Sequence, residues 1–215
     1  MIKCSFLSRG YLKALECLRQ ETFEGVIPAC NEELCLPLSD GSSSSGGPID
    51  QSMCLLLRGT FYILNKQMQE AFGGLEKVIN DETASVDVRV NALIKRASLF
   101  IQQCKDPHKD PELSLADFKR AEELNPKNAD VYHHRGQVYL LIDQIDNAIA
   151  DFKKAVELNP EFPIAYVQKL FTDYRKASMN NNLETINNII NLFEVAVQKF
   201  STCVESYALF AQVRK

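Results

Sequence analysis

Apolar residues along most of the chain recur every three or four positions, the spacing that predicts amphipathic α-helices. In residues 129–162 the small and aromatic positions of two successive predicted helices follow this spacing: Tyr132, Gly136 and Tyr139 in the first, and Ala148, Phe152 and Ala155 in the second. Pro160 ends the second predicted helix, because proline has no N–H group with which to continue it. No strand pattern competes, so the chain is predicted to be all-helical.

A ten-residue pattern recurs 34 residues further along. Residues 117–126 read DFKRAEELNP, and residues 151–160 read DFKKAVELNP. This is the period of the tetratricopeptide repeat (TPR), in which each unit is one helix–turn–helix. The marker positions of that repeat are occupied in residues 129–162, except that Tyr132 stands where Trp is usual. We therefore predict an all-α, TPR-type α-solenoid, a superhelical stack of helix–turn–helix repeats.

The repeat register divides the chain into seven segments. They are a degenerate helical repeat at residues 1–38, a Ser/Gly-rich linker at 39–50, a TPR-like repeat at 51–84, a TPR repeat with an insertion at 85–128, a TPR repeat at 129–162, a TPR repeat with an insertion at 163–203, and the first helix of an incomplete repeat at 204–215. Loops are expected near residues 106–111 and 180–182. A first helix without its partner leaves an apolar face open, so we expect this sequence to be an internal piece of a longer array.

Composition and charge narrow the functional classes. The net charge of −4 argues against a nucleic-acid partner, which needs a concentrated basic surface. The seven cysteines follow no metal-ligand spacing, and the neighbours His133 and His134 would point about 100° apart on a helix, so no metal is predicted. The sequence has no local nucleophile motif and no glycine-rich phosphate loop. We therefore predict a binding protein that has no cofactor and is not an enzyme.

The first helices of stacked TPR units line a concave groove. The second, fifth and ninth positions of three units give nine candidate peptide-binding residues: Asn91, Ile94, Ser98, Asp130, His133, Gln137, Ile164, Val167 and Phe171. Polar centres with apolar flanks suit a hydrophobic or amphipathic peptide. The alternative function is a chaperone adaptor that binds the carboxylate terminus of a heat-shock chaperone. Such a site needs Lys, Arg and Asn donors, and Asn91 is the only one in the set. The alternative role for each position is packing against the next repeat.

Four stretches carry a closer resemblance. They are residues 10–14 (GYLKA), 91–96 (NALIKR), 128–137 (NADVYHHRGQ) and 206–212 (SYALFAQ). These stretches are similar to the metazoan mitochondrial import receptors that form the 70-kDa TPR subunit of the outer-membrane translocase. The resemblance covers nearly the whole chain from Gly10, and residues 128–137 go furthest beyond the general TPR pattern.

The resemblance implies a receptor on the cytosolic face of the mitochondrial outer membrane, whose membrane anchor would lie outside this chain. It implies that the partners are mitochondrial precursor proteins with hydrophobic internal targeting signals, such as metabolite carriers. The receptor would pass them to other subunits of the outer-membrane translocase. Cytosolic chaperones would bind through repeats that are absent from this sequence.

Overall fold

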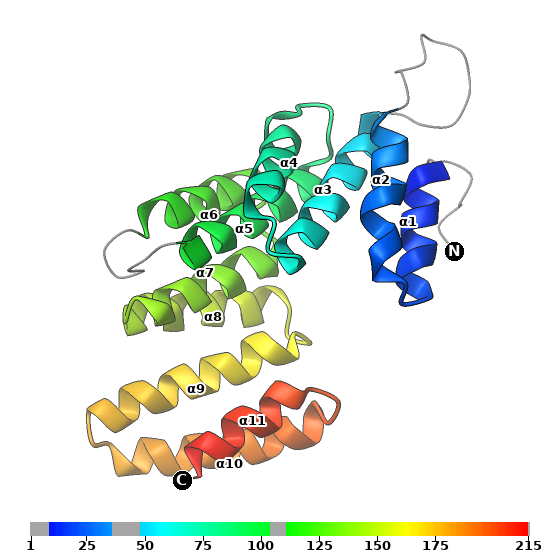
Figure 1. Ribbon diagram of the computed structural model, residues 1–215. Helices are drawn as coiled ribbons and strands as arrows, with labels where there is room; N and C mark the ends of the chain where they lie inside the picture. The colour runs from blue at the N-terminus through cyan, green and yellow to red at the C-terminus, as the bar shows by residue number, and fades with distance from the viewer. Residues whose placement is uncertain (1–8, 36–47, 104–110, 215) are drawn as a thin grey trace. The chain divides into compact units, whose positions relative to one another are not determined.

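The structure of the protein is a computed structural model that describes residues 9–35, 48–103 and 111–214 (Figure 1). Over these residues the backbone forms eleven α-helices, one short 3-10 helix and no strand, which confirms the predicted all-α, TPR-type fold. The chain divides into two compact units, Met1–Gln102 and Gln103–Lys215.

The first unit is built from packed helices. Its elements are α1 (Arg9–Arg19), the 3-10 helix η2 (Phe23–Gly25), α2 (Val26–Leu34), α3 (Pro48–Leu64), α4 (Met68–Asn80) and α5 (Val86–Gln103), whose last residue lies at the unit boundary. Helix α1 packs on α2, α2 packs on α3, and α3 packs on α4. One core cluster joins the first three helices through buried side chains of Ala14, Val26, Ala29, Cys30, Cys54 and Phe61.

The second unit continues the same construction. Its helices are α6 (Glu112–Leu124), α7 (Ala129–Leu141), α8 (Ile145–Leu158), α9 (Pro163–Met179), α10 (Leu183–Lys199) and α11 (Val204–Val213). Each helix packs against the next, and α11 also packs against α9. In Figure 1 the yellow α9 lies between α8 and the pair formed by α10 and α11.

The observed helix pairs can be compared with the predicted segments. The pairs α7–α8 and α9–α10 lie inside the predicted repeats at 129–162 and 163–203. Helix α3 begins at Pro48, inside the predicted linker at 39–50. Residues 36–47 and 104–110 lie outside the described residues, so the rest of that linker and most of the loop near 106–111 stay predictions.

The insertion in residues 163–203 is helical. Helices α9 and α10 have 17 residues each, whereas α7 and α8 have 13 and 14. The turn between α9 and α10 is short, and Asn181 adopts a φ of 52°, which Asn tolerates better than most residues. The Asn182 side chain then accepts a hydrogen bond from the Thr185 N–H at 3.0 Å and caps α10. The extra length therefore gives α9 a longer face than α7.

A buried ion-pair network ties α6, α7 and α8 together. Arg135 donates from Nε and Nη2 to the Asp151 carboxylate at 2.7 and 2.9 Å, and from Nη1 to Glu122 at 2.5 Å. The Tyr132 hydroxyl donates to the same Glu122 carboxylate at 3.1 Å. The hydrogen bond with Asp151, and then the one with Glu122, raises the pKa of Arg135, so its guanidinium stays charged although only 14% of the side chain is exposed. Removing one partner of such a buried pair is costly, because the other charge is left without compensation.

The two helices of the α7–α8 pair meet most closely at Gly136. A Cβ atom added there would lie 2.9 Å from Cε1 of Phe152, whose side chain is fully buried in the second helix. By contrast, a Cβ atom on Gly73, which lies exposed in α4, would meet nothing within 4 Å. Gly136 is therefore required by packing, whereas Gly73 is not.

We predict opposite effects from one substitution at these two glycines. Gly136→Ala should lower the free energy of unfolding by roughly 1–2 kcal/mol, because the overpacking cost exceeds the gain in helix propensity. Gly73→Ala should raise it by roughly 0.5–1 kcal/mol, because only the gain in propensity remains. Urea unfolding, read with native-state hydrogen exchange to separate the two units, measures both. Stabilisation by both substitutions would contradict the close approach at Gly136.

Candidate functional site

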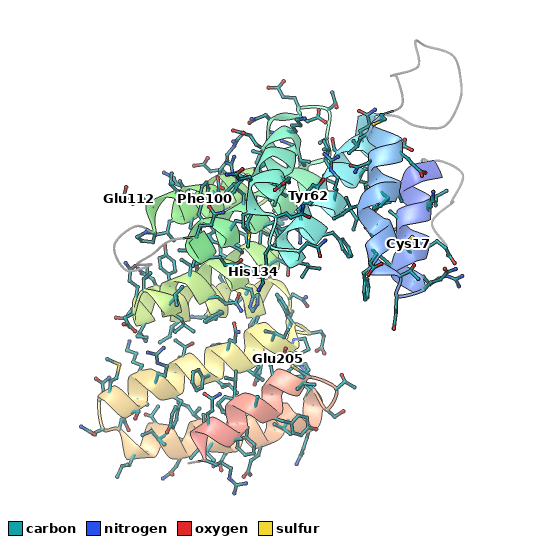
Figure 2. The ribbon with its side chains drawn as sticks, viewed as in Figure 1. Cys17, Tyr62, Phe100, Glu112, His134 and Glu205 are labelled. Carbon is teal, nitrogen blue, oxygen red and sulfur yellow. The ribbon has the colours of Figure 1, made fainter. Side chains whose placement is uncertain are left out.

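Helix α7 carries three of the predicted groove positions in the second unit. Asp130 is exposed in the first turn of the helix. Gln137 is half-buried, and its Oε1 lies 3.1 Å from Nδ1 of His134, which is labelled in Figure 2. His133 is buried, with 4% of the residue exposed. Of these three positions, Asp130 and Gln137 are therefore accessible to a ligand, and His133 packs instead.

His133 occupies an aromatic pocket inside the second unit. Its ring lies 4.9 Å from the ring of Phe162 and 6.0 Å from that of Phe152. Burial, and then the charge of the neighbouring His134, lower the pKa of His133 from 6.5 to about 3. Its Nδ1 atom is buried and has no hydrogen-bond partner among the described residues. The side chain is therefore neutral at physiological pH and serves the helix packing.

The three predicted positions of α5 lie in the first unit. Asn91 is exposed, while Ile94 is buried in the core. Ser98 is half-buried, and its Oγ donates to the carbonyl oxygen of Ile94 at 3.0 Å, which satisfies the hydroxyl within the helix. Of these three positions, Asn91 is the one whose side chain is fully available to contact a ligand.

Helix α9 presents the most apolar accessible surface of the three predicted sets. Val167 is fully buried in a core cluster, whereas Ile164 and Phe171 pack against that cluster and stay partly exposed. Gln168 lies between these two on the same face, at helical spacing i+4 from Ile164 and i−3 from Phe171. Its buried Oε1 has no hydrogen-bond partner among the described residues. We call Ile164, Gln168 and Phe171 the α9 face.

The structure thus corrects the predicted groove set at three positions. Ile94, His133 and Val167 lie inside the helix packing, because the fifth position of each first helix points toward neighbouring core side chains. The other six positions are at least partly accessible: Asn91, Ser98, Asp130, Gln137, Ile164 and Phe171. Gln168 was missed, although the spacing of Ile164 and Phe171 already places it between them.

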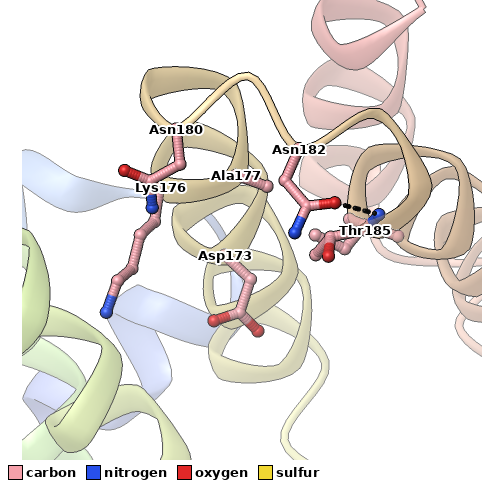
Figure 3. A pocket seen from close by; sticks show the side chains of 7 residues that line it. Asp173, Lys176, Ala177, Asn180, Asn182 and Thr185 are labelled. Atoms are coloured by element: carbon pink, nitrogen blue, oxygen red, sulfur yellow. Dashed lines mark hydrogen bonds between the residues drawn. The ribbon is translucent and has the colours of Figure 1, made fainter.

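A polar pocket of about 290 Å³ lies beside the turn between α9 and α10 (Figure 3). It is lined by Asp173, Lys176, Ala177, Asn180, Asn182, Thr185 and Ile189. Lys176 already pairs with Asp146 of α8 at 2.6 Å, so its charge is compensated. The sequence pattern predicted only a loop here, although the run of three Asn marked a polar turn.

An apolar pocket of about 290 Å³ lies in the first unit, between η2 and the end of α3. Phe23 and Phe61 form one wall with their rings 6.2 Å apart, and Leu64, Glu24 and Asn65 complete it. Phe23 is 54% exposed and Leu64 is 67% exposed, so the pocket can receive an apolar side chain. The helical spacing of the sequence did not indicate this pocket, because Phe23 lies in η2, between the two helices of the degenerate repeat.

Residues 9–35, 48–103 and 111–214 bear on two further classes of site. No group of three His, Cys, Asp or Glu side chains there is placed to hold a metal ion. None of the helices in those ranges combines the length and the apolar character needed to cross a bilayer.

Comparison with known proteins defines the class first. The family profile described as the tetratricopeptide repeat matches residues 129–162, the segment that forms α7 and α8. Solved TPR structures also match nearly the whole chain. Yeast Tom70 superposes with a TM-score of 0.67 at 24% identity, covering 90% of this chain and 37% of that one. TTC0263, a thermophilic TPR protein of Thermus thermophilus, gives 0.66 at 14% identity, covering 95% and 96%. The chain is therefore a tetratricopeptide-repeat α-solenoid.

Sequence relatives then narrow the class. The chain is 41% identical over 203 residues to the human mitochondrial import receptor subunit TOM70, and 39% identical to the rat protein of that name. Each match covers 94% of this chain and 31% of the relative, so the chain spans about a third of their length. The chain is thus homologous to part of the mitochondrial import receptor subunit TOM70, which confirms the resemblance found in the sequence.

The burial of His133 predicts a pH dependence of stability. Its pKa is about 3 in the folded state and near 6.5 in the unfolded state, so between these values the unfolded state binds more protons. The free energy of unfolding should therefore fall as pH decreases from 6.5 to 3, by up to ~1.4 kcal/mol per pH unit from this residue. In His133→Phe this contribution should disappear.

Urea unfolding at half-unit pH intervals measures the slope. His134→Phe is the matched control, because it leaves the buried ring of His133 in place and removes only the smaller cause of the lowered pKa, so most of the slope should remain. If His133→Phe kept the full slope of the unsubstituted chain, the neutral, buried assignment of His133 would be wrong.

Proposed function

We propose that this chain acts in a mitochondrial protein-import receptor, where it binds precursor proteins that carry hydrophobic internal targeting signals, such as metabolite carriers. The receptor works at the cytosolic face of the mitochondrial outer membrane and passes precursors to other subunits of the translocase there. The chain contributes a binding surface and catalyses no reaction.

The observation that carries this proposal is the homology to part of TOM70, at 41% identity over 94% of the chain. Homology at this level over nearly every helix supports a shared role for the segment. The name of the relatives gives the class of function, a receptor for mitochondrial import. The precursor class and the transfer to the translocase are the finer parts of the proposal.

The chemistry of the α9 face supports the precursor class. Ile164 and Phe171 offer partly exposed apolar side chains about two helical turns apart. Gln168 between them has an acceptor oxygen that no described residue uses. A peptide that presents two apolar side chains at this spacing would contact Ile164 and Phe171, and a backbone N–H between them would reach Gln168 once its side chain turns outward.

The charges on α7 support a hydrophobic ligand over an acidic one. Arg135 is the basic residue of α7, the first helix of its repeat. The carboxylates of Asp151 and Glu122 already neutralise its charge. A clamp for a chaperone carboxylate would need an uncommitted cation at such a position. The acidic peptide of a heat-shock chaperone is therefore a suitable negative control for binding.

We predict that Phe171→Asp weakens binding of a metabolite-carrier precursor by about tenfold, because an aromatic contact in a small interface carries more than 1 kcal/mol. Fluorescence anisotropy with a labelled carrier segment measures the affinity, and a matrix-targeted presequence serves as the comparison ligand. Leu192→Asp on α10 is the matched control, since it places the same charge at an exposed apolar position of a second helix.

Circular dichroism melts of both variants establish that the fold is intact, because Phe171 also packs against the core cluster. Equal losses in Phe171→Asp and Leu192→Asp would reject the α9 face as the site while leaving the receptor role open. An absence of any preference for the carrier segment over the presequence and the chaperone peptide would contradict the receptor proposal itself.

A further inference from the structure

Two cysteines meet inside the core of the first unit. Cys30 lies on α2 and Cys54 lies on α3, and both are fully buried in the cluster that joins these helices. Both are free thiols, and a hydrogen bond joins their two side chains. The pair thus brings two sulfur atoms into contact from neighbouring helices.

A guanidinium group lies beside this pair. Arg58 follows Cys54 by one helical turn on α3, so the two side chains share a face. One end of the guanidinium is fixed, because Nη1 donates to Oδ1 of Asn31 at 2.6 Å and the group lies over the ring of Tyr62 at 5.7 Å. Its Nε atom is buried and has no hydrogen-bond partner among the described residues. A buried donor without an acceptor favours an anion nearby.

These groups favour the thiolate form of Cys30. The hydrogen bond from Cys54 lowers the pKa of the Cys30 thiol, burial opposes this effect, and the charge of Arg58 lowers the pKa further. Thiolates are the nucleophilic form of cysteine, and a second thiol in contact can resolve an oxidised one. A cysteine that serves only packing has neither a favoured thiolate form nor a second thiol in contact.

We propose that Cys30 and Cys54 form an oxidisable dithiol that hydrogen peroxide converts to a disulfide between α2 and α3. The Cys30 thiolate attacks one oxygen of the peroxide, whose O–O bond breaks, and gives a sulfenic acid and hydroxide. The Cys54 thiol then attacks the Cys30 sulfur, the S–O bond breaks, and water leaves. Sulfur is oxidised and the peroxide oxygens are reduced, so the step needs no other reagent.

The disulfide would close the chain between residues 30 and 54 and fix the first helix pair to α3. Peroxide is close to water in size and reaches the buried pair during local separation of α2 and α3. Cross-linking removes freedom from the unfolded chain, so the oxidised first unit should be more stable. The contact between α2 and α3 opens locally while the thiols are reduced, and the disulfide would hold it closed by a covalent bond.

Peptide mapping of the peroxide-treated, folded chain tests the proposal. Cleavage after Glu32 or Glu33 and before Asp40 or Asp50 separates Cys30, Cys35 and Cys54 onto different peptides. The expected product is a Cys30–Cys54 cross-link that dithiothreitol reverses. The oxidised chain should also melt at least roughly 8 °C higher than the reduced chain in the transition of the first unit.

Three variants separate the roles within the pair. Cys54→Ala should leave a sulfenic acid on Cys30 that dimedone traps, because the resolving thiol is gone. Arg58→Met should slow disulfide formation at least threefold, and Arg58→Lys should restore most of the rate, because the charge returns. Cys35→Ala is the matched control, since Cys35 is the exposed cysteine next to α2 and its loss should leave the cross-link unchanged.

The opposite results are equally clear. Oxidation confined to Cys35, or a cross-link from Cys30 to Cys35, would overturn the proposal. So would a rate in Arg58→Met equal to that of the unsubstituted chain. Circular dichroism of each reduced variant keeps a folding defect apart from a loss of reactivity.

Discussion

The helix pairs α3–α4 and α7–α8 each depend on a close approach between their two helices at a glycine of the first helix. At Gly136 the space that a Cβ would occupy is already taken by the buried ring of Phe152, and at Gly59 it is bounded by Leu75. A repeat of about 34 residues buries one face in this contact and leaves the other for the next repeat. The burial of His133 between Phe152 and Phe162, and the ion pairs of Arg135, follow from the same geometry.

The fold could be predicted because its determinants are local. The helix–turn–helix unit can be predicted from nearby residues alone, namely from the 34-residue offset, Gly136 and Pro160. The course of the insertion in 163–203 could not be predicted as well. Seven extra residues can form a loop or lengthen two helices, and the sequence between Pro163 and Lys199 has no proline or glycine to break a helix.

The groove was predictable only in part, because the accessibility of a position depends on its neighbours in space. The register placed the predicted groove positions on α5, α7 and α9, and α7 and α9 each pack on the helix that follows. It could not foresee that Phe162, which precedes α9, packs its ring against His133. The dithiol of Cys30 and Cys54 was equally hidden, since only the packing of α2 on α3 brings these residues together. Sequence spacing predicts the direction in which a side chain points from the helix axis. Whether that side chain is buried depends on the neighbouring side chains that it meets.

Under the proposed function, binding and stability draw largely, but not wholly, on different residues of the same helices, since Phe171 also packs against the core cluster. The fifth positions are buried in the helix packing, whereas Ile164 and Phe171 of the proposed α9 site stay partly exposed. Site-specific photo-cross-linking tests this division most directly, with benzoyl-phenylalanine placed at Phe171 or at Val195, an apolar position of α10 that is 59% exposed. The account predicts that a carrier precursor cross-links at position 171 and not at position 195. Cross-linking at 195 alone, or equally at both, would contradict it.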